Sequence, residues 1–154
     1  MRFQTLAVKH ELRTLPGRST VLFTAHSLPE RVLVDDPYPG QLQASATAIA
    51  NAVGLDRRSG WSIAWQSAAR TADPWRGPDV LEVLADIAAA GSSDGVLVCP
   101  QGFTADHLEV LYDLDDVAAG RAAELGLAFA RTRSLNDDEA VLTALAGRIA
   151  ALEV

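Results

Sequence analysis

VLFTAHSLP, residues 21–29, is the stretch of sequence that decides the fold. Its first five residues, with Ser19 and Thr20 before them, form a compact apolar and β-branched run. Such a run is typical of a strand that is buried on both faces of a parallel sheet. His26 marks the point where the run passes into a loop that contains serine and proline. We therefore expect a buried strand over 19–25 with a histidine beyond its carboxyl end.

Further strands and helices alternate along the rest of the chain. Apolar runs predict strands, and helical periodicity bounded by proline or glycine predicts helices. The other expected strands are 61–65, 95–99 and 127–131. The expected helices are 3–15, 39–53 and 79–90. Two more are expected: an acidic helix that begins near Asp106 and could break before Asp116, and a last helix that is capped by Asn136 or Asp137 and runs to 152. This alternation favours a three-layer, Rossmann-like α/β fold, with about four parallel strands and helices on both faces.

Three polar motifs follow separate predicted strands. His26 follows the first, Gln66 and Ser67 follow the second, and the Pro-Gly loop 100–105 follows the third. In open parallel sheets, ligands bind beyond the carboxyl ends of the strands, where the strand order reverses. The three motifs are therefore expected to meet at one edge of the sheet and form a site.

Composition bounds the class of protein. The 154 residues suit one domain, and the net charge of −7 argues against binding to nucleic acid, whose phosphates need a basic face. No run of about 20 uncharged apolar residues exists, so no membrane span is expected. The first residues lack the apolar core of a signal peptide, which makes a cytoplasmic location the expectation. Cys99 is the single cysteine, which excludes an internal disulfide and a cysteine-ligated iron–sulfur cluster within one chain.

Histidine and carboxylates supply the candidate chemistry. Glu109 and Asp113 are four residues apart and share a face of a helix, and Asp116, three residues further, is expected to continue that stripe. A row of carboxylates at an open edge can bind hydrated divalent cations and relay protons. An imidazole, which ordinarily titrates at a pH of about 6.5, can take protons from a ligand at neutral pH.

In their order and spacing, these stretches resemble the ferrochelatases, which insert ferrous iron into a porphyrin. The resemblance runs from about Thr20 to the C-terminus and covers the second half of such an enzyme. It rests on the sequence TAHSLP (residues 24–29), on Asp36-Pro37-Tyr38, on the block around Trp65-Gln66-Ser67, and on the stretch 99–113. Two positions depart from the family pattern: Asp35 stands in place of a glycine, and Val117 in place of an acidic residue.

The resemblance implies a role for each candidate residue. His26 and Glu109 would be the catalytic pair, the metal path would comprise His26, Glu109, Asp113 and Asp116, and the porphyrin would contact Trp65, Gln66, Ser67 and Arg70. Arg70 is the candidate for a porphyrin propionate, because a guanidinium pairs well with a carboxylate. Ferrous iron would be the substrate, and coproporphyrin III or protoporphyrin IX its acceptor.

The resemblance also implies an organisation, that of a type II chelatase lobe. Residues 1–18 would form a lead-in helix, and 19–154 a single domain equivalent to the C-terminal lobe of a ferrochelatase. A missing N-terminal lobe, or a second copy of the chain, would close the porphyrin cleft. Two alternatives remain open: a flavodoxin-like or other small-molecule-binding module, which no phosphate-binding glycine motif supports, and a non-catalytic lobe that binds tetrapyrrole or assembles with a chelatase partner.

Overall fold

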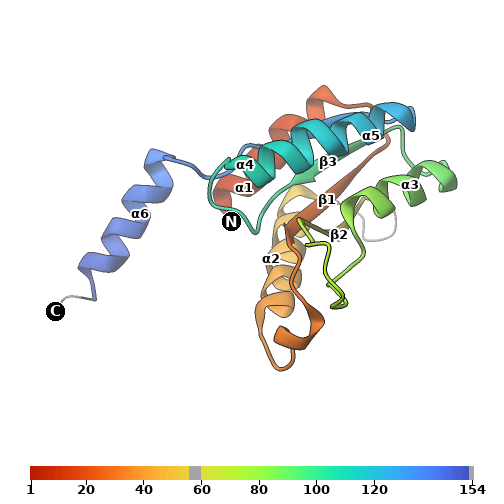
Figure 1. The fold of residues 1–154 in the computed structure, drawn as a ribbon. Coiled ribbons are helices and arrows are strands. Elements are labelled where there is room, and N and C mark those ends of the chain that lie inside the picture. The colour runs from red at the N-terminus through yellow and green to blue at the C-terminus, as the bar shows by residue number, and fades with distance from the viewer. Residues whose placement is uncertain (56–59, 153–154) are drawn as a thin grey trace.

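The sheet has four parallel strands. The computed structural model describes residues 1–55 and 60–152. Its strands are β1 (Ser19–His26), β2 (Trp61–Gln66), β3 (Gly95–Cys99) and β4 (Ala128–Arg131), in the spatial order β2-β1-β3-β4 (Figure 1). All four predicted strands are present, each with a boundary within one residue of the prediction. The predicted fold class is therefore confirmed.

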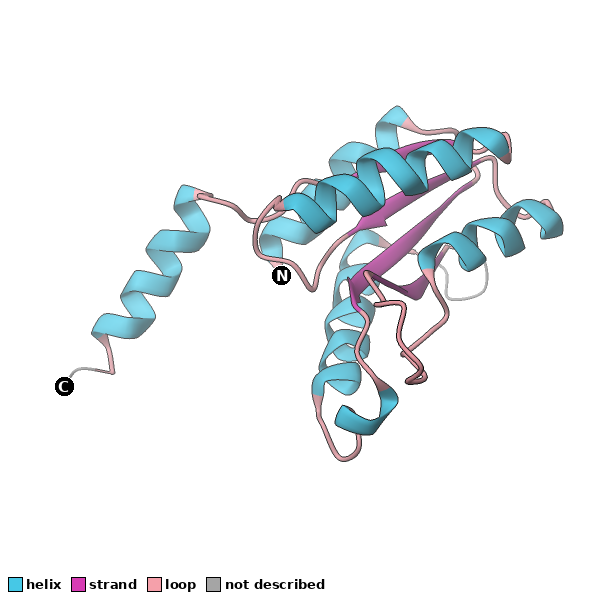
Figure 2. Ribbon diagram, in the orientation of Figure 1, coloured by secondary structure: helices cyan, strands magenta, loops and turns pink. Residues whose placement is uncertain are grey.

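Helices cover both faces of this sheet (Figure 2). They are α1 (Arg2–Glu11), α2 (Tyr38–Val53), α3 (Val80–Ala90), α4 (Leu108–Val110), α5 (Ala119–Glu124) and α6 (Glu139–Ala150), with short 3₁₀ turns at Leu12–Thr14 and Glu30–Val32. Between α4 and α5 lies a π-helix, η3 (Leu111–Ala118), so that one continuous helix runs from 108 to 124. The helix begins at Leu108, two residues after the expected start near Asp106, and the break considered before Asp116 does not occur.

Alternation along the strands assigns side chains to the two faces. Val21 and Phe23 of β1 pack against α1 and α2, whereas Leu22 packs against α3 and the long helix 108–124. The six central residues of β1 are all buried, as expected for a central strand of a covered parallel sheet. His26, in phase with Leu22, belongs to the face that carries the long helix.

The strand order reverses between β1 and β3. From β1 the chain passes through α2 to β2 on one side, and then through α3 to β3 on the other side. The carboxyl ends of β1 and β3 therefore flank a topological switch point, where parallel sheets bind ligands. The residues at these two ends are His26 and the loop that follows Cys99.

That loop lies directly against β1. The amide of Gly102 donates to the carbonyl oxygen of Thr24 at 3.1 Å. A Cβ atom at residue 102 would lie 2.5 Å from the Cβ of Ala25 and 2.8 Å from its Cα. Only glycine allows this approach, which brings the next residue, Phe103, to the histidine at the strand end.

The two terminal helices differ in their packing. Val8 of α1 is fully buried against α2 and the sheet, so α1 is part of the body of the protein. In contrast, α6 extends away from the body (Figure 1) and has no buried residue; Leu142, Leu145 and Ile149 are about half exposed. Among the described residues, no helix has the length and apolar character needed to cross a membrane.

Candidate active site

His26 and Glu109 face each other at the switch point. The distance from His26 Nε2 to Glu109 Oε2 is 3.7 Å, and the two side chains are 33% and 54% exposed. His26 is the last residue of β1, and Glu109 is the second residue of α4. The structure thus brings together two residues that the sequence separates widely, at the predicted edge of the sheet.

The ring of His26 has a defined tautomer. Its Nδ1 lies 2.5 Å from the carbonyl oxygen of Ser27. Because a carbonyl oxygen can only accept, Nδ1 carries the hydrogen and donates it. In the neutral ring, Nε2 then keeps a free lone pair, and this lone pair is on the side of the Glu109 carboxylate. Two electron-pair donors facing each other favour a cation between them, either a proton or a metal ion.

The size of the gap limits what it can hold. Bonds of a divalent metal such as zinc to imidazole nitrogen and carboxylate oxygen are about 2.1 Å long. One ion can therefore bridge a separation of 3.7 Å. A flat macrocycle needs about 7 Å, which is two van der Waals contacts of about 3.5 Å. The gap between His26 and Glu109 is about half of that distance, so it does not admit a porphyrin plane in this arrangement.

Asp113 is held by Ser67. The hydroxyl of Ser67 donates to Oδ2 of Asp113, linking the end of β2 to the π-helix. Ser67 has a φ of 61°, an uncommon conformation for a residue with a side chain. Two residues predicted for different ligands, porphyrin for Ser67 and metal for Asp113, are therefore direct partners of each other.

The π-helix changes which residues share a face. Its i→i+5 hydrogen bonds widen the turn, so that residues four to five apart lie above one another rather than three to four. Val117, four residues after Asp113, continues the line of Glu109 and Asp113, whereas Asp116 lies off that line and is exposed. The geometry therefore does not place Asp116 on the carboxylate stripe, and its role as a ligand stays a prediction. Among the residues that the structure describes, no group of three or more potential ligands is arranged for a metal.

Two of the predicted porphyrin contacts lie inside the protein. Trp65 is 4% exposed and packs on the opposite face of the sheet from His26, with its ring 5.8 Å from that of Tyr38. Gln66 is 1% exposed, and its Oε1 accepts from the hydroxyl of Thr24 at 2.8 Å. Burial leaves neither side chain a surface for a macrocycle in this arrangement. Arg70, by contrast, is exposed in the loop after β2, and its pairing with a propionate stays a prediction.

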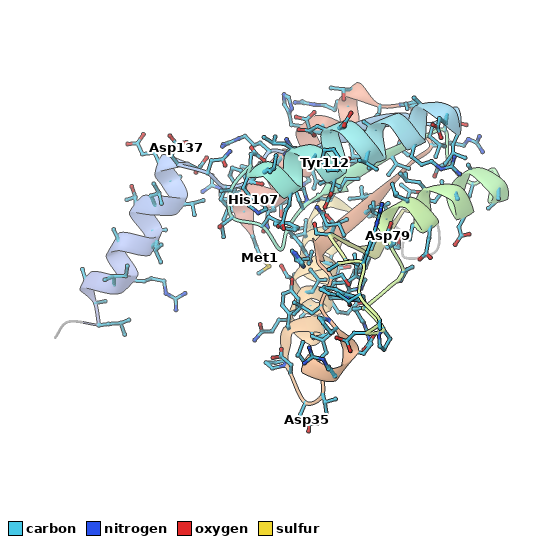
Figure 3. The ribbon with its side chains drawn as sticks, in the orientation of Figure 1. Met1, Asp35, Asp79, His107, Tyr112 and Asp137 are labelled. Atoms are coloured by element: carbon cyan, nitrogen blue, oxygen red, sulfur yellow. The ribbon has the colours of Figure 1, made fainter. Side chains whose placement is uncertain are left out.

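Asp35, which stands in place of the family's glycine, adopts a backbone conformation typical of glycine. Asp35 has a φ of 59°, a region that glycine enters freely and that aspartate tolerates better than most residues. It lies at the tip of the loop before α2, away from Tyr112 on the long helix and from His107 at the start of that helix (Figure 3). Asp35 therefore occupies a glycine-like turn in the loop before α2.

Sequence reasoning missed two neighbours of the site. The buried ring of Phe103 has its centroid 6.3 Å from that of His26 and 5.3 Å from that of His107. Asp79 caps α3, accepting from the amide of Leu81 at 2.8 Å, and lies close enough to Asp113 to be affected by its charge. The Gln-Gly-Phe sequence could have indicated Phe103, because the glycine marks a close backbone approach.

Asp79 gives the protein a testable pH dependence. Burial, and to a smaller extent the charges of Glu82 and Asp113, raise the pKa of Asp79 above its ordinary 3.8. The folded state therefore holds this proton more tightly than the unfolded chain. The contribution of this proton to the free energy of unfolding is complete below about pH 3.8. It is lost as the pH rises through the raised pKa of Asp79 in the folded state.

We expect Asp79→Asn to remove this loss, because asparagine caps a helix about as well as aspartate but does not ionise. The free energy of unfolding, measured in urea from pH 3 upward, should fall less with rising pH in the variant than in the wild type. Asp86→Asn is the matched control, since it makes the same change at an exposed position of the same helix. Parallel curves for Asp79→Asn and the wild type would contradict the prediction.

The fold and the site together define a class. A parallel α/β lobe with a histidine–carboxylate pair at its switch point is suited to metal-ion and proton chemistry on a ligand bound at the strand ends. The family model named Ferrochelatase matches residues 2–152 of this chain. The chain belongs to the ferrochelatase family.

Individual relatives agree with this assignment. The chain is 50% identical over 127 residues to the ferrochelatase of Herpetosiphon aurantiacus, covering 82% of this chain and 40% of that protein. It is 48% identical over 124 residues to the ferrochelatase of Thermus thermophilus, covering 80% and 38%. It is 40% identical over 120 residues to the coproporphyrin III ferrochelatase of Halalkalibacterium halodurans, covering 77% and 38%. The chain thus matches about two fifths of the length of these curated relatives.

Proposed function

We propose that this chain is the half of a ferrochelatase that carries the catalytic histidine and glutamate, His26 and Glu109. Its reaction is the insertion of ferrous iron into a porphyrin, in haem biosynthesis. The observation that carries the proposal is the 3.7 Å approach of the lone pair of His26 Nε2 to the carboxylate of Glu109. Membership of the ferrochelatase family and the position of this pair at the switch point support it.

The reaction requires bases as well as a metal path. A porphyrin loses two pyrrole protons when a divalent ion enters, and the products are the metalloporphyrin and two protons. His26 Nε2, free of hydrogen in the neutral ring, accepts one of them. Glu109 carries the second proton or the incoming ion, and Asp113, oriented by Ser67, supplies the next carboxylate along the helix. Imidazole nitrogen and carboxylate oxygen together suit ferrous iron, which is a substrate here.

The macrocycle needs more surface than this chain offers. At a separation of 3.7 Å, His26 and Glu109 bind the ion or the proton between them, and they must part to admit a porphyrin plane. The lobe that the longer relatives carry, or a second copy of the chain, supplies the facing wall and holds the macrocycle. Arg70 pairs with a propionate at the edge of the ring. Coproporphyrin III is the favoured porphyrin, because several relatives at about 40% identity carry its name.

Metal binding by the chain itself provides the test. We expect the protein to bind cobalt(II), a coloured substitute for ferrous iron, through His26 and Glu109 with help from Asp113. Asp113→Ala should weaken the binding about 10-fold, because it removes one oxygen ligand or the group that orients the bound ion. Visible absorption of cobalt(II), titrated into each protein, measures the dissociation constant.

The control is Asp137→Ala, which removes the same charge from an exposed position just before α6, where no residue of the candidate metal path lies. It should leave the dissociation constant within about twofold of the wild type, since exposed charges at a distance are screened. Equal binding by Asp113→Ala and Asp137→Ala would remove Asp113 from the metal path. Binding that survives Glu109→Gln would contradict the proposed function.

A further inference from the structure

Arg131 forms the most extensive side-chain network near the site. Its Nε and Nη2 donate to the two carboxylate oxygens of Asp115 at 2.6 and 2.8 Å, and its Nη1 donates to Asp106 Oδ1 at 2.7 Å. The Arg131 side chain, at the end of β4, is only 13% exposed. A guanidinium with this fixed geometry binds two carboxylates at once, which a lysine ammonium does far less specifically.

The two carboxylates lie on either side of the catalytic segment. Asp106 is in the loop three residues before Glu109, and Asp115 is in the π-helix two residues after Asp113. Arg131 therefore ties both ends of the segment that carries Glu109 and Asp113 to the same strand end. Such a link fixes the position and the rotation of the segment relative to the sheet.

The helix needs an external restraint of this kind. Its N-cap residue, His107, makes no side-chain capping bond, so the start of the helix is not held by its own cap. After the short segment α4, residues 111–118 form a π-helix, a rare conformation that is found mostly as single-turn insertions at functional sites. A helix with neither a cap nor regular α geometry depends on tertiary contacts for its exact position.

Asp106 extends the restraint to the neighbouring loop. Asn136 donates from Nδ2 to Asp106 Oδ2 at 2.8 Å and accepts from the amide of Asp106 at 2.8 Å. Burial works to raise the pKa of Asp106, but hydrogen bonds from Asn136, Ser134 and Arg131 outweigh it, and the net result is a lowered pKa. The carboxylate is thus ionised at neutral pH and permanently available to the guanidinium.

We propose that Arg131 is the positioning residue for the metal and proton chemistry of this site: by clamping Asp106 and Asp115 it keeps Glu109 opposite His26 and Asp113 beside Ser67. Arg131 itself touches neither the metal nor the porphyrin. The role in metal chemistry rests on the proposed function, whereas the clamp is a property of this chain that can be measured without a metal.

Cobalt(II) binding separates positioning from plain electrostatics. Arg131→Met removes a positive charge near the carboxylates, and the direct electrostatic effect of this change is tighter cation binding. If the clamp positions the ligands, binding becomes weaker instead, by about 10-fold, as when a group that orients a metal ligand is lost. Arg131→Lys keeps the charge but cannot form the paired hydrogen bonds of the guanidinium. Its dissociation constant for cobalt(II) should fall between those of the wild type and Arg131→Met.

The matched control is Arg121→Met, at the far end of the same long helix, where Arg121 pairs with Glu124 at the surface. It removes the same charge and should change the dissociation constant less than about twofold. Circular dichroism and urea unfolding establish that each variant is folded, and Arg131→Lys is the variant to use if Arg131→Met is not. Binding by the Arg131 variants that equals or exceeds that of the wild type would overturn the proposal.

A second readout needs no metal. The ring signals of His26 and the amide signal of Ser67, followed by NMR without metal, should shift in Arg131→Met and Arg131→Lys but not in Arg121→Met. Unchanged signals in the Arg131 variants would also overturn the proposal that Arg131 positions this segment. If the wild-type protein binds no cobalt(II), but the Arg131 variants show these shifts, the proposed function is contradicted and the positioning role of Arg131 is established.

Discussion

His26→Ala should lower the rate of iron insertion by at least about 100-fold, which is the loss expected when a positioned general base is removed. The rate is to be measured with the chain joined to the lobe that its longer relatives carry, covalently or in trans. Under the proposed function, residues 1–154 alone should insert iron poorly, because the orientation of a large flat macrocycle would depend on the additional lobe of the longer relatives. Absorption of the porphyrin as it becomes metallated measures the rate.

His10→Ala is the control for this measurement. His10 is exposed on α1, where its Nδ1 lies 3.1 Å from the adjacent Glu11, and its loss should leave the rate within about twofold of the wild type, as for most surface substitutions. Insertion that survives His26→Ala would refute the role assigned to this residue. Rapid insertion by a demonstrated monomer of the chain alone would refute the idea that a second wall is needed.

Gly102→Ala should destabilise the protein by about 3 kcal/mol, at the upper end of the usual cost of overpacking. The added methyl group would lie 2.5 Å from the Cβ of Ala25, a fully buried residue of the central strand, and 2.8 Å from its Cα. The loop cannot retreat without losing the hydrogen bond from Gly102 to Thr24. Urea unfolding measures the change, and the ring of Phe103 should move away from His26 in the same variant.

Gly120→Ala is the matched control, because Gly120 lies in α5 with no atom near the position of a new Cβ. There the same substitution should be neutral or stabilising by up to about 1 kcal/mol. The double variant Ala25→Gly, Gly102→Ala should recover part of the lost stability, since it removes the nearest colliding atom. A single variant as stable as the wild type would show that the loop approaches β1 less closely than the structure indicates.

Most of the fold follows from local patterns. The run of apolar residues in 19–25 predicted the central strand because a strand covered on both faces has no polar side to alternate. Gly54 and Gly91 marked the ends of α2 and α3, and both adopt the left-handed conformation that glycine favours. Local sequence is informative here because these signals act within a few residues.

The details of the site could not be predicted in this way. Period-based reasoning assumes an α-helix, and the π-helix therefore took Asp116 off the stripe that i, i+3 spacing predicted. The sequence around Trp65 and Gln66 did not indicate whether these side chains are buried or exposed, and the structure buries both of them. The width of the gap between His26 and Glu109 depends on contacts between distant segments, for which the sequence contains no short-range signal.

Within the described residues, the exposed helix α6 has no contact of its own with the body of the protein that would account for its stability. A helix of 12 residues is close to the shortest that is stable in water without a partner surface, and α6 has no buried residue to stabilise it. Any surface that covered Leu142, Leu145 and Ile149 would supply the free energy that orders these residues. Formation of α6 and binding of such a surface would then be a single equilibrium, and the measured affinity would be the intrinsic affinity reduced by the cost of ordering the helix.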